Sequence, residues 1–369
     1  MRQDLLANDV VLMEDNCNLS CEYCLTGQSN FKKHHSLKLI FEPPRKADFA
    51  PGSELRGRVD SLLAAFEGTA QLPILKLTGG EIFWIRNIME LLRDVSKRYA
   101  TVVIQTNGVL LTSEMCDEIK SWGNACLQIS LDAVGYEGNS YRSRDARQHG
   151  RVLSSIHRIL DKQIPTEIYL VLNDRSLPAL EDTLEKLLSY EDHLVVCPFP
   201  VRGPGKERFY PKPEQIWHLE RVLEKYDYYS PILPPRAYLL RLIRFMREGQ
   251  RAFRCHLPRF AFTAFDDGLV TPCPNIWFNS LGNVLKENPA EVVKKIGQEA
   301  FYSILLAERP RIDACKGCFT PWDMLSMYVD GEITLDELCK GPMYSAPQSR
   351  ERIREITAKY REEPVCSPS

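Results

Sequence analysis

Short runs of β-branched and other apolar residues alternate with segments of helical periodicity over the first 205 residues. The intervening segments place apolar residues at helical spacing, for example over 85–99 and 177–190. Six apolar runs predict strands, at 10–14, 74–81, 101–108, 126–133, 166–173 and 194–203. This alternation predicts an α/β fold with a parallel sheet, either a partial (β/α)6 TIM-like barrel or an open doubly wound sheet.

Polar and glycine residues follow the apolar part of several predicted strands. In both kinds of sheet, ligands bind at the carboxyl ends of parallel strands. We therefore expect one mouth of the sheet to gather a polar set: Gly79, Gly80, Glu81, Asn107, Gly108, Ser130, Asp132 and Asn173.

The rest of the chain shows a different pattern. Residues 27–54 combine prolines, charges and little periodicity, which predicts an irregular insertion that could act as a lid. The C-terminal stretch 349–363 reads as an exposed charged helix. The expected division is a barrel at 1–205, a linker with a bridging helix at 206–250, a small cysteine-bearing domain at 251–340, and a helix and tail at 341–369.

The composition of the 369 residues is ordinary for a globular protein, with 44% apolar and 26% charged residues. The net charge of −2 gives no reason to expect nucleic acid as a partner. No apolar run is long enough to cross a bilayer, and no secretion signal is visible, so we expect a cytoplasmic protein without membrane partners. In that reducing compartment, twelve cysteines read as metal ligands or reactive thiols before they read as disulfides.

The first cysteine motif is CNLSCEYC at 17–24, with the spacing C-x3-C-x2-C. Thiolates favour soft metals, and three cysteines with one open position suit an iron–sulfur cluster that has one iron free for a ligand. A zinc site completed by His34 or His35 is the alternative, although zinc sites usually use C-x2-C pairs.

Together with the strand-end sequence TGGE, this motif resembles the radical S-adenosylmethionine (SAM) superfamily over roughly residues 8–205. The residues that carry the resemblance are Cys17, Cys21 and Cys24, Tyr23 just before the third cysteine, and Thr78, Gly79, Gly80 and Glu81. The resemblance implies a [4Fe–4S] cluster that binds SAM and receives an electron from a donor such as flavodoxin or ferredoxin. It also implies cleavage of SAM to a 5′-deoxyadenosyl radical, which takes a hydrogen atom from the substrate.

The resemblance also implies roles for the residues that would bind SAM. The segment 79–81 would hold the methionine ammonium, because glycines allow close approach and a carboxylate pairs a cation. Arg142 or Arg144 would clamp the methionine carboxylate, unless each is simply a solvated surface charge. Tyr23 would border the adenine. Ser130 and Asp132 would reach the ribose or methionine part or, alternatively, cap a helix, and Thr78, Asn107 and Asn173 complete the expected cofactor-binding set.

The second cysteine motif comprises Cys255, Cys273, Cys315 and Cys318, the last two in the sequence CKGC. Four cysteines can ligate a second cluster completely. The spacing resembles the twitch and SPASM auxiliary-cluster regions of the same superfamily. The further cysteines of a full SPASM domain are missing after Cys318, which favours one auxiliary [4Fe–4S] cluster. A structural zinc site is the alternative, and Cys339 is a spare ligand or has no role.

An auxiliary cluster with four protein ligands could accept an electron from a substrate radical, as oxidation of an alcohol to a ketone requires. Cys197, in the predicted strand 194–203, could instead donate a hydrogen atom to a product radical, as an epimerase needs. Its alternative is a small buried hydrophobic residue. Aromatic residues in 272–279 and 319–323 could wall a small substrate pocket.

The leading hypothesis is a radical SAM dehydrogenase or epimerase acting on a small polar metabolite of the sugar or aminocyclitol type. The single auxiliary motif resembles that of the radical SAM alcohol dehydrogenase of butirosin synthesis. A peptide-modifying maturase is the alternative, which we disfavour because many maturases carry a leader-binding domain before a motif that begins here at residue 17. A zinc-binding structural protein would not require the strand-end glycines and carboxylates. A glycyl-radical activase fits poorly, because no second cysteine cluster follows the first directly.

Overall fold

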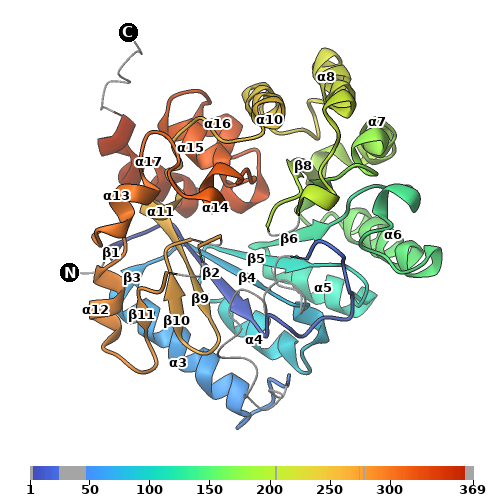
Figure 1. The fold of residues 1–369 in the computed structure, drawn as a ribbon. Helices are drawn as coiled ribbons and strands as arrows, with labels where there is room; N and C mark the ends of the chain where they lie inside the picture. Colours follow the sequence, from blue (N-terminus) through green and yellow to red (C-terminus); the bar gives the residue numbers. More distant parts are fainter. Residues whose placement is uncertain (1–2, 25–46, 204–205, 274, 277–278, 362–369) are drawn as a thin grey trace.

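A computed structural model describes residues 3–24, 47–203, 206–273, 275–276 and 279–361, and its centre is a nine-stranded sheet (Figure 1). Six parallel strands lie side by side in chain order: β2 (Ala7–Leu12), β4 (Ile74–Gly79), β5 (Thr101–Thr106), β6 (Ala125–Ser130), β7 (Thr166–Leu172) and β8 (Leu194–Pro200). A doubly wound sheet would reverse its strand order at a switch point. The unreversed order therefore confirms the partial barrel of the two folds that the sequence allowed.

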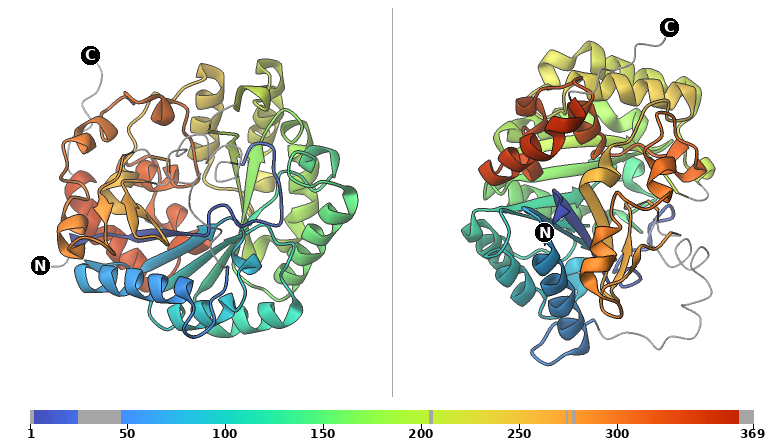
Figure 2. Two further views of the ribbon diagram at one scale, coloured as in Figure 1. Left: turned by 60° about the horizontal axis from the view of Figure 1, so that its bottom comes forward. Right: turned by 90° about the vertical axis from the view of Figure 1, so that its left-hand side faces the viewer.

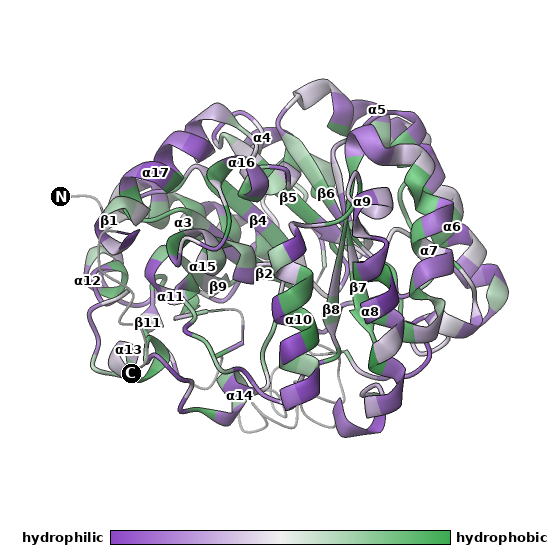
Figure 3. Cartoon of the chain, turned by 90° about the horizontal axis from the view of Figure 1, so that it is seen from above, coloured by the Kyte–Doolittle hydropathy of each residue, from purple (hydrophilic) through white to green (hydrophobic). Residues whose placement is uncertain are grey.

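The crossover helices that join these strands are α3 (Glu54–Thr69), α4 (Ile88–Val95), α5 (Ser113–Trp122), α6 (Ala146–Asp161) and α7 (Leu180–Leu187). Capping residues in the sequence determine where several of these helices begin. Ser53, Thr112 and Asp145 accept hydrogen bonds from backbone N–H groups of the first turns of α3, α5 and α6. Figure 3 shows hydrophobic residues concentrated on the strands and hydrophilic residues on the outer turns of α5 and α6.

The C-terminal third of the chain extends the sheet beyond β2. Strand β9 (Ala261–Phe265) pairs in parallel with β2, and β10 (Leu269–Thr271) and β11 (Gly282–Asn283) continue from it as antiparallel strands. Figure 2 shows this part of the chain, in orange and red, packed alongside the blue β2. The second cysteine region is therefore built onto the edge of the barrel sheet itself.

Helices α8 (Trp217–Glu224), α9 (Tyr226–Tyr229) and α10 (Arg236–Glu248) occupy the segment after β8. Their buried residues include Tyr229, Tyr238 and Leu242, so this segment belongs to the packed core as well as connecting two regions. The remaining short elements are α11 (Leu257–Phe260), α12 (Pro289–Lys294), α13 (Phe301–Leu305), α14 (Asp313–Lys316), α15 (Asp323–Val329), α16 (Leu335–Leu338), the strand pair β1 (Gln3–Asp4) and β3 (Ala70–Gln71), and the 3₁₀ helices at 82–84, 137–139, 177–179, 188–193, 206–208, 213–216 and 342–344.

The last helix, α17 (Pro347–Arg361), differs from the exposed helix that the sequence predicts. Ser349, Ile353 and Thr357 are fully buried on one face. The Ser349 hydroxyl lies 3.3 Å from that of Thr101, so this face packs against the barrel. The high charge of the helix conceals this narrow buried face in the sequence. Across the described ranges, no helix has the length and apolar content to cross a membrane.

Candidate active site

The first cysteine loop is held by the two glycines at the end of β4. A Cβ atom on Gly79 would lie 1.8 Å from the Leu12 carbonyl oxygen, and one on Gly80 would lie 2.2 Å from the Asn16 carbonyl oxygen. The Gly80 N–H donates to the Met13 carbonyl at 3.3 Å. Backbone thus packs directly on backbone, and only glycine permits this approach. The glycines position the loop that continues into Cys17.

The three thiols of this loop are electrostatic neighbours. Burial raises the pKa of Cys21 to about 12, Arg142 opposes this rise, and the Cys24 and Cys17 thiols add to it. The Leu19 N–H donates to Cys17 Sγ at 3.4 Å, and the Asn107 side-chain amide donates to the same sulfur at 3.8 Å. Donors aimed at cysteine sulfur are a common feature of iron–sulfur ligation, so this loop fits a cluster held by three thiolates.

Glu81 ties the ends of two strands together. Its carboxylate accepts hydrogen bonds from the Asn107 N–H at 2.7 Å, the Thr106 hydroxyl at 2.6 Å and the Phe83 N–H at 3.1 Å. Burial raises the pKa of Glu81, and these three hydrogen bonds oppose the rise. The carboxylate is therefore engaged within the protein, and Glu81 is not among the residues that line the cavity described below.

Asp132, which follows β6, joins the cysteine loop to the neighbouring strand ends. Its buried carboxylate accepts hydrogen bonds from the Tyr23 hydroxyl, from Arg142 Nε at 3.2 Å and from the Asn173 amide at 3.2 Å. Burial raises the pKa of Asp132, and Arg142 opposes the rise. Asp132 and Asn173 therefore support Tyr23 and Arg142 from behind, and neither lines the cavity.

The structure separates the two arginines that the sequence left as alternatives. The Arg142 side chain is 10% exposed, pairs with Asp132 and lines the cavity. The Arg144 side chain is 85% exposed and lies 3.5 Å from the Asp145 carboxylate. Of these two arginines, Arg142 is therefore the one whose side chain lies beside the cysteines.

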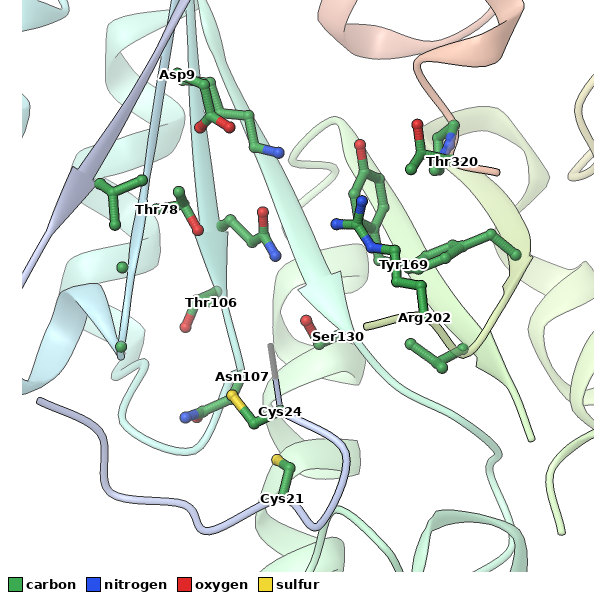
Figure 4. Close-up of a pocket in the computed structure, with 18 of the residues that line it drawn as sticks. Asp9, Cys21, Cys24, Thr78, Thr106, Asn107, Ser130, Tyr169, Arg202 and Thr320 are labelled. Atoms are coloured by element: carbon green, nitrogen blue, oxygen red, sulfur yellow. The ribbon is translucent and has the colours of Figure 1, made fainter. Parts of the chain in front are cut away.

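One cavity of about 200 Å³ adjoins the first cysteine loop (Figure 4). Of the residues expected at the mouth, those that line it are Cys17, Cys21, Tyr23, Cys24, Thr78, Gly79, Gly80, Asn107, Ser130 and Arg142. The opposite wall comes from β7, β8 and the C-terminal region. It includes Tyr169, Phe199, Asn275, Thr320 and Trp322. The segment 319–323 therefore supplies an aromatic wall through Trp322, whereas Trp277 and Phe278, the aromatic residues of 272–279, lie outside the described residues.

The second cysteine group brings together Cys255, Cys273, Cys315 and Cys318, with no disulfide among them. Burial raises the pKa of Cys255 to about 11 and that of Cys315 to about 12, and the Cys318 thiol adds to both. Burial also raises the pKa of Cys273, and the other three thiols add to that rise. The four thiols are therefore close enough to act on one another electrostatically.

Two neighbouring side chains contact Cys318 of this group. Asn275, on the cavity wall, donates its side-chain N–H to Cys318 Sγ at 2.8 Å. Arg251 donates to the Cys318 carbonyl at 2.8 Å and forms a buried ion pair with Asp323 at 2.6 Å. Asn275 thus lies between the second cysteine group and the cavity.

Other predicted residues lie apart from these groups. Cys197 on β8 is fully buried beneath the cavity wall and does not line the cavity. Burial raises its pKa well above the usual range, and nearby Glu167 adds to the rise. Cys339 has Asp336 and two arginines as its charged neighbours. His34 and His35 lie outside the described residues, as does most of the expected insertion.

As their side chains stand, no three His, Cys, Asp or Glu residues within the described ranges form a group that would hold a single metal ion.

Residues 11–187 match the family described as the Radical SAM superfamily. This part of the chain is a radical SAM domain. It contains the first cysteine loop, both strand-end glycines and the strands β4–β7. Radical SAM domains use a [4Fe–4S] cluster together with SAM, and Cys17, Cys21 and Cys24 are the residues that would hold it here, with two N–H donors directed at the Cys17 sulfur.

Curated relatives of the radical SAM domain carry out different reactions. The chain is 24% identical over 177 residues to Fe-coproporphyrin III synthase of Methanosarcina barkeri, covering 47% of this chain and 40% of the relative. It is 29% identical over 184 residues to GTP 3′,8-cyclase of Nitrobacter hamburgensis, covering 46% and 47%. It is 28% identical over 229 residues to the subtilosin biosynthesis protein AlbA of Bacillus subtilis, covering 58% and 47%. The chain spans less than half the length of these relatives.

Solved radical SAM structures share the fold over more of the chain. The structure of anSMEcpe with bound AdoMet has a TM-score of 0.58 at 15% identity and covers 96% of this chain and 98% of its own. Streptococcus suis SuiB bound to the precursor peptide SuiA has a TM-score of 0.59 at 12% identity and covers 85% and 70%. At these identities, the likeness establishes the fold.

Sequence reasoning missed the charged residues inside the barrel. Asp9, Lys76 and Arg202 line the cavity, as do the polar Gln105 and Thr263. A signal was present, because Lys76 interrupts the apolar run ILKLTG and Asp9 precedes another apolar run. A charge at an inward position of a buried strand is a candidate for function.

Proposed function

We propose that this radical SAM enzyme removes a hydrogen atom from a small polar metabolite, of the sugar or aminocyclitol type, and dehydrogenates or epimerises it. When bound, the cluster and SAM supply a 5′-deoxyadenosyl radical as the hydrogen acceptor. The residues of this chain bind SAM, orient the substrate and exclude water.

The observation that carries the proposal is that one continuous cavity reaches from Cys21 and Cys24 to the C-terminal wall formed by Thr320 and Trp322. A substrate in this cavity would have the first cysteine loop on one side and the second cysteine group behind Asn275 on the other. Such an arrangement suits a reaction in which a hydrogen atom leaves on one side and an electron on the other.

The chain offers a distinct set of side chains for SAM. Arg142, held by Asp132, carries a buried positive charge beside the cysteines and suits the methionine carboxylate. The Gly79 and Gly80 backbone lines the same end, as do Thr78 and Ser130. Because Glu81 accepts three internal hydrogen bonds, we assign it the role of fixing the strand ends on which these groups stand.

We assign a second [4Fe–4S] cluster to the four clustered thiols. Four thiolates complete a cube without leaving an open iron, so the expected role is electron transfer. Oxidation of an alcohol carbon to a ketone removes one hydrogen atom from carbon, one proton from the hydroxyl and one electron. A cluster held by these four thiolates would supply the acceptor for the electron, SAM bound beside the first cysteine loop would supply the acceptor for the hydrogen atom, and the proton would pass to solvent or a base.

A peptide side chain is the second candidate substrate. SuiB has been solved bound to its precursor peptide, and AlbA is a bacteriocin biosynthesis protein. These likenesses give a specific reason to include peptides in any substrate search.

The first test is the iron and zinc content and the EPR spectrum of anaerobically purified protein. We expect about eight iron atoms per wild-type chain and about four in a Cys17/Cys21/Cys24→Ala variant, as two four-iron clusters require. SAM cleavage should be lost in the variant. Bound zinc with about four iron atoms in the wild type would refute the auxiliary cluster and with it the electron exit.

The second test identifies the substrate class. Production of 5′-deoxyadenosine by the reduced holoenzyme is measured with a panel of sugars and aminocyclitols and with a panel of short peptides. A deuterated compound from either panel that increases 5′-deoxyadenosine production and transfers its deuterium to 5′-deoxyadenosine is the hydrogen donor. Stimulation by peptides alone would reject the metabolite proposal.

A further inference from the structure

The inner end of the cavity is lined by three charged side chains from different parts of the sheet. Asp9 on β2 and Lys76 on β4 are register partners, so both side chains lie on the same face of the sheet. Their exposed fractions are only 3% and 4%. Arg202 follows β8 on the facing wall. Figure 4 shows Asp9 at the end of the cavity opposite Cys21, with Arg202 across from the strands.

Asp9 and Lys76 lack direct partners within the described part of the chain. Asp9 Oδ1 is buried without a hydrogen-bond partner there. The Lys76 ammonium makes no hydrogen bond or ion pair with the described residues, and it lies 5.4 Å from the centre of the Tyr169 ring and 5.7 Å from that of Trp322. Asp9, its register partner, is the opposite charge that acts on it most strongly, but at more than ion-pair distance. A buried charge without a partner is costly and is rarely retained unless a ligand satisfies it.

The surrounding side chains do not supply the hydrogen-bond partners that Asp9 and Lys76 lack. The Glu167 carboxylate lies behind Lys76 and acts on it electrostatically, but it accepts hydrogen bonds from Gln128 at 2.6 Å and from the Met343 N–H at 3.3 Å. Arg202 donates one N–H to the Asn275 side chain, and a guanidinium carries four more N–H donors. Among the residues that line this end, two positive charges therefore face one negative charge.

We infer that Lys76 and Arg202 bind an anionic group of the substrate, a carboxylate or a phosphate, and that Asp9 accepts a hydrogen bond from a neighbouring hydroxyl or amino group. The ligand class is thus a small molecule with an anionic group beside a hydrogen-bond donor. A guanidinium fork and a flexible ammonium suit the anion, and a carboxylate suits the donor. Tyr169 and Trp322 flank the ammonium and shield the site from water.

This inference deepens the proposed function, since it names the substrate class of the same cavity. It also links the substrate to the second cysteine group. Arg202 holds Asn275, whose other side-chain atom donates to Cys318 Sγ. An anion on Arg202 would therefore lie two side chains away from those thiols, at the side where the proposed electron leaves.

The test measures binding without turnover. Anaerobic holoenzyme is saturated with SAM, so that the cysteine end of the cavity is filled, and no reductant is added. Calorimetry then compares glycerate and glycerol 3-phosphate with propionate, which lacks hydroxyls, and with glycerol, which lacks the anion. We expect an anion affinity on the order of 1 mM, about −4 kcal/mol, with glycerol undetected.

Lys76→Met and Arg202→Gln should each weaken the binding of the preferred anion at least tenfold, and Lys97→Met, a change at an exposed lysine, should leave it unchanged. Asp9→Asn should reduce the advantage of glycerate over propionate. The ratio between glycerate and glycerol 3-phosphate in the wild type distinguishes a carboxylate site from a phosphate site. Iron content and SAM binding of each variant show that it is folded.

Equal binding of the anions to wild type, Lys76→Met and Arg202→Gln would overturn the inference, as would binding of glycerol as tight as that of glycerate. Absence of anion binding at tens of millimolar would do the same. If Lys76→Met does not fold, Arg202→Gln decides alone, because Arg202 is only partly buried. A different result would separate this inference from the proposed function. If Lys76→Met and Arg202→Gln weaken anion binding as expected but the reduced wild-type enzyme does not cleave SAM, the proposed function is refuted and the anion site stands.

Discussion

The close approach between Gly80 and the cysteine loop gives a prediction that can be worked from the coordinates. In Gly80→Ala the added Cβ would meet three backbone atoms of Asn16, at 2.2, 2.5 and 2.9 Å. Real Cβ contacts essentially never fall below 3.0 Å, so the loop must retreat from the oxygen by about 0.8 Å. No side-chain rotation can relieve the overlap, because every clashing atom belongs to the backbone.

The retreat would also stretch the hydrogen bond from the Glu81 N–H to the Asn16 carbonyl, now 2.9 Å, and would move Cys17, the next residue. A displacement of about 1 Å in a catalytic constellation can lower the rate roughly 100-fold. We therefore expect Gly80→Ala to lose at least about 100-fold in SAM cleavage, with partial or complete loss of the iron bound to the first loop.

The assay combines iron analysis with the rate of 5′-deoxyadenosine formation under reducing conditions. Gly150→Ala is the matched control, because the residue lies inside α6 and its Cβ would meet no atom within 4 Å apart from the adjoining backbone of that helix. The control should retain both iron and activity. Wild-type iron and SAM cleavage in Gly80→Ala would refute the argument that backbone contact positions the cysteine loop.

Three further predictions follow from the site. Arg142→Gln should weaken SAM binding at least tenfold in equilibrium dialysis, because it removes the buried cation beside the cysteines. Arg144→Gln, at an exposed position, should bind SAM like the wild type. Equal effects of the two changes would reject Arg142 as the residue that binds the methionine carboxylate. Asp323→Leu should destabilise the protein by about 3–5 kcal/mol in urea unfolding, because it leaves Arg251 charged and buried, and the further change Arg251→Leu should restore much of that loss. A single-variant loss below about 1 kcal/mol would contradict this. Because Cys197 is buried and does not line the cavity, Cys197→Ala should leave both SAM cleavage and turnover of an identified substrate intact, and a loss of turnover alone would instead support Cys197 as the hydrogen donor of an epimerisation.

Much of the fold could be predicted from the sequence because its signals are local. Apolar runs separated by amphipathic segments are sufficient to predict parallel strands with crossover helices. The spacing of Cys17, Cys21 and Cys24 is also a local property, and so is the pair of glycines before Glu81. These features predict the radical SAM domain before any contact is known.

The roles of individual charged residues could be assigned only from the tertiary structure. Arg142 and Arg144 are two positions apart, and only the fold decides that one is buried against Asp132 while the other is exposed. The sequence suggests Glu81 as a ligand, but in the structure its carboxylate meets donors from the end of the next strand.

The deepest part of the site also depended on strand register. Asp9 and Lys76 lie 67 positions apart in the sequence and become neighbours only because β2 and β4 pair in this register. Asn275 reaches both Arg202 and Cys318 because β9 joins the edge of β2 and brings the C-terminal region over the cavity. Spacing along the chain reports which groups share a loop or a helix face, whereas contacts between distant strands arise from packing the whole core.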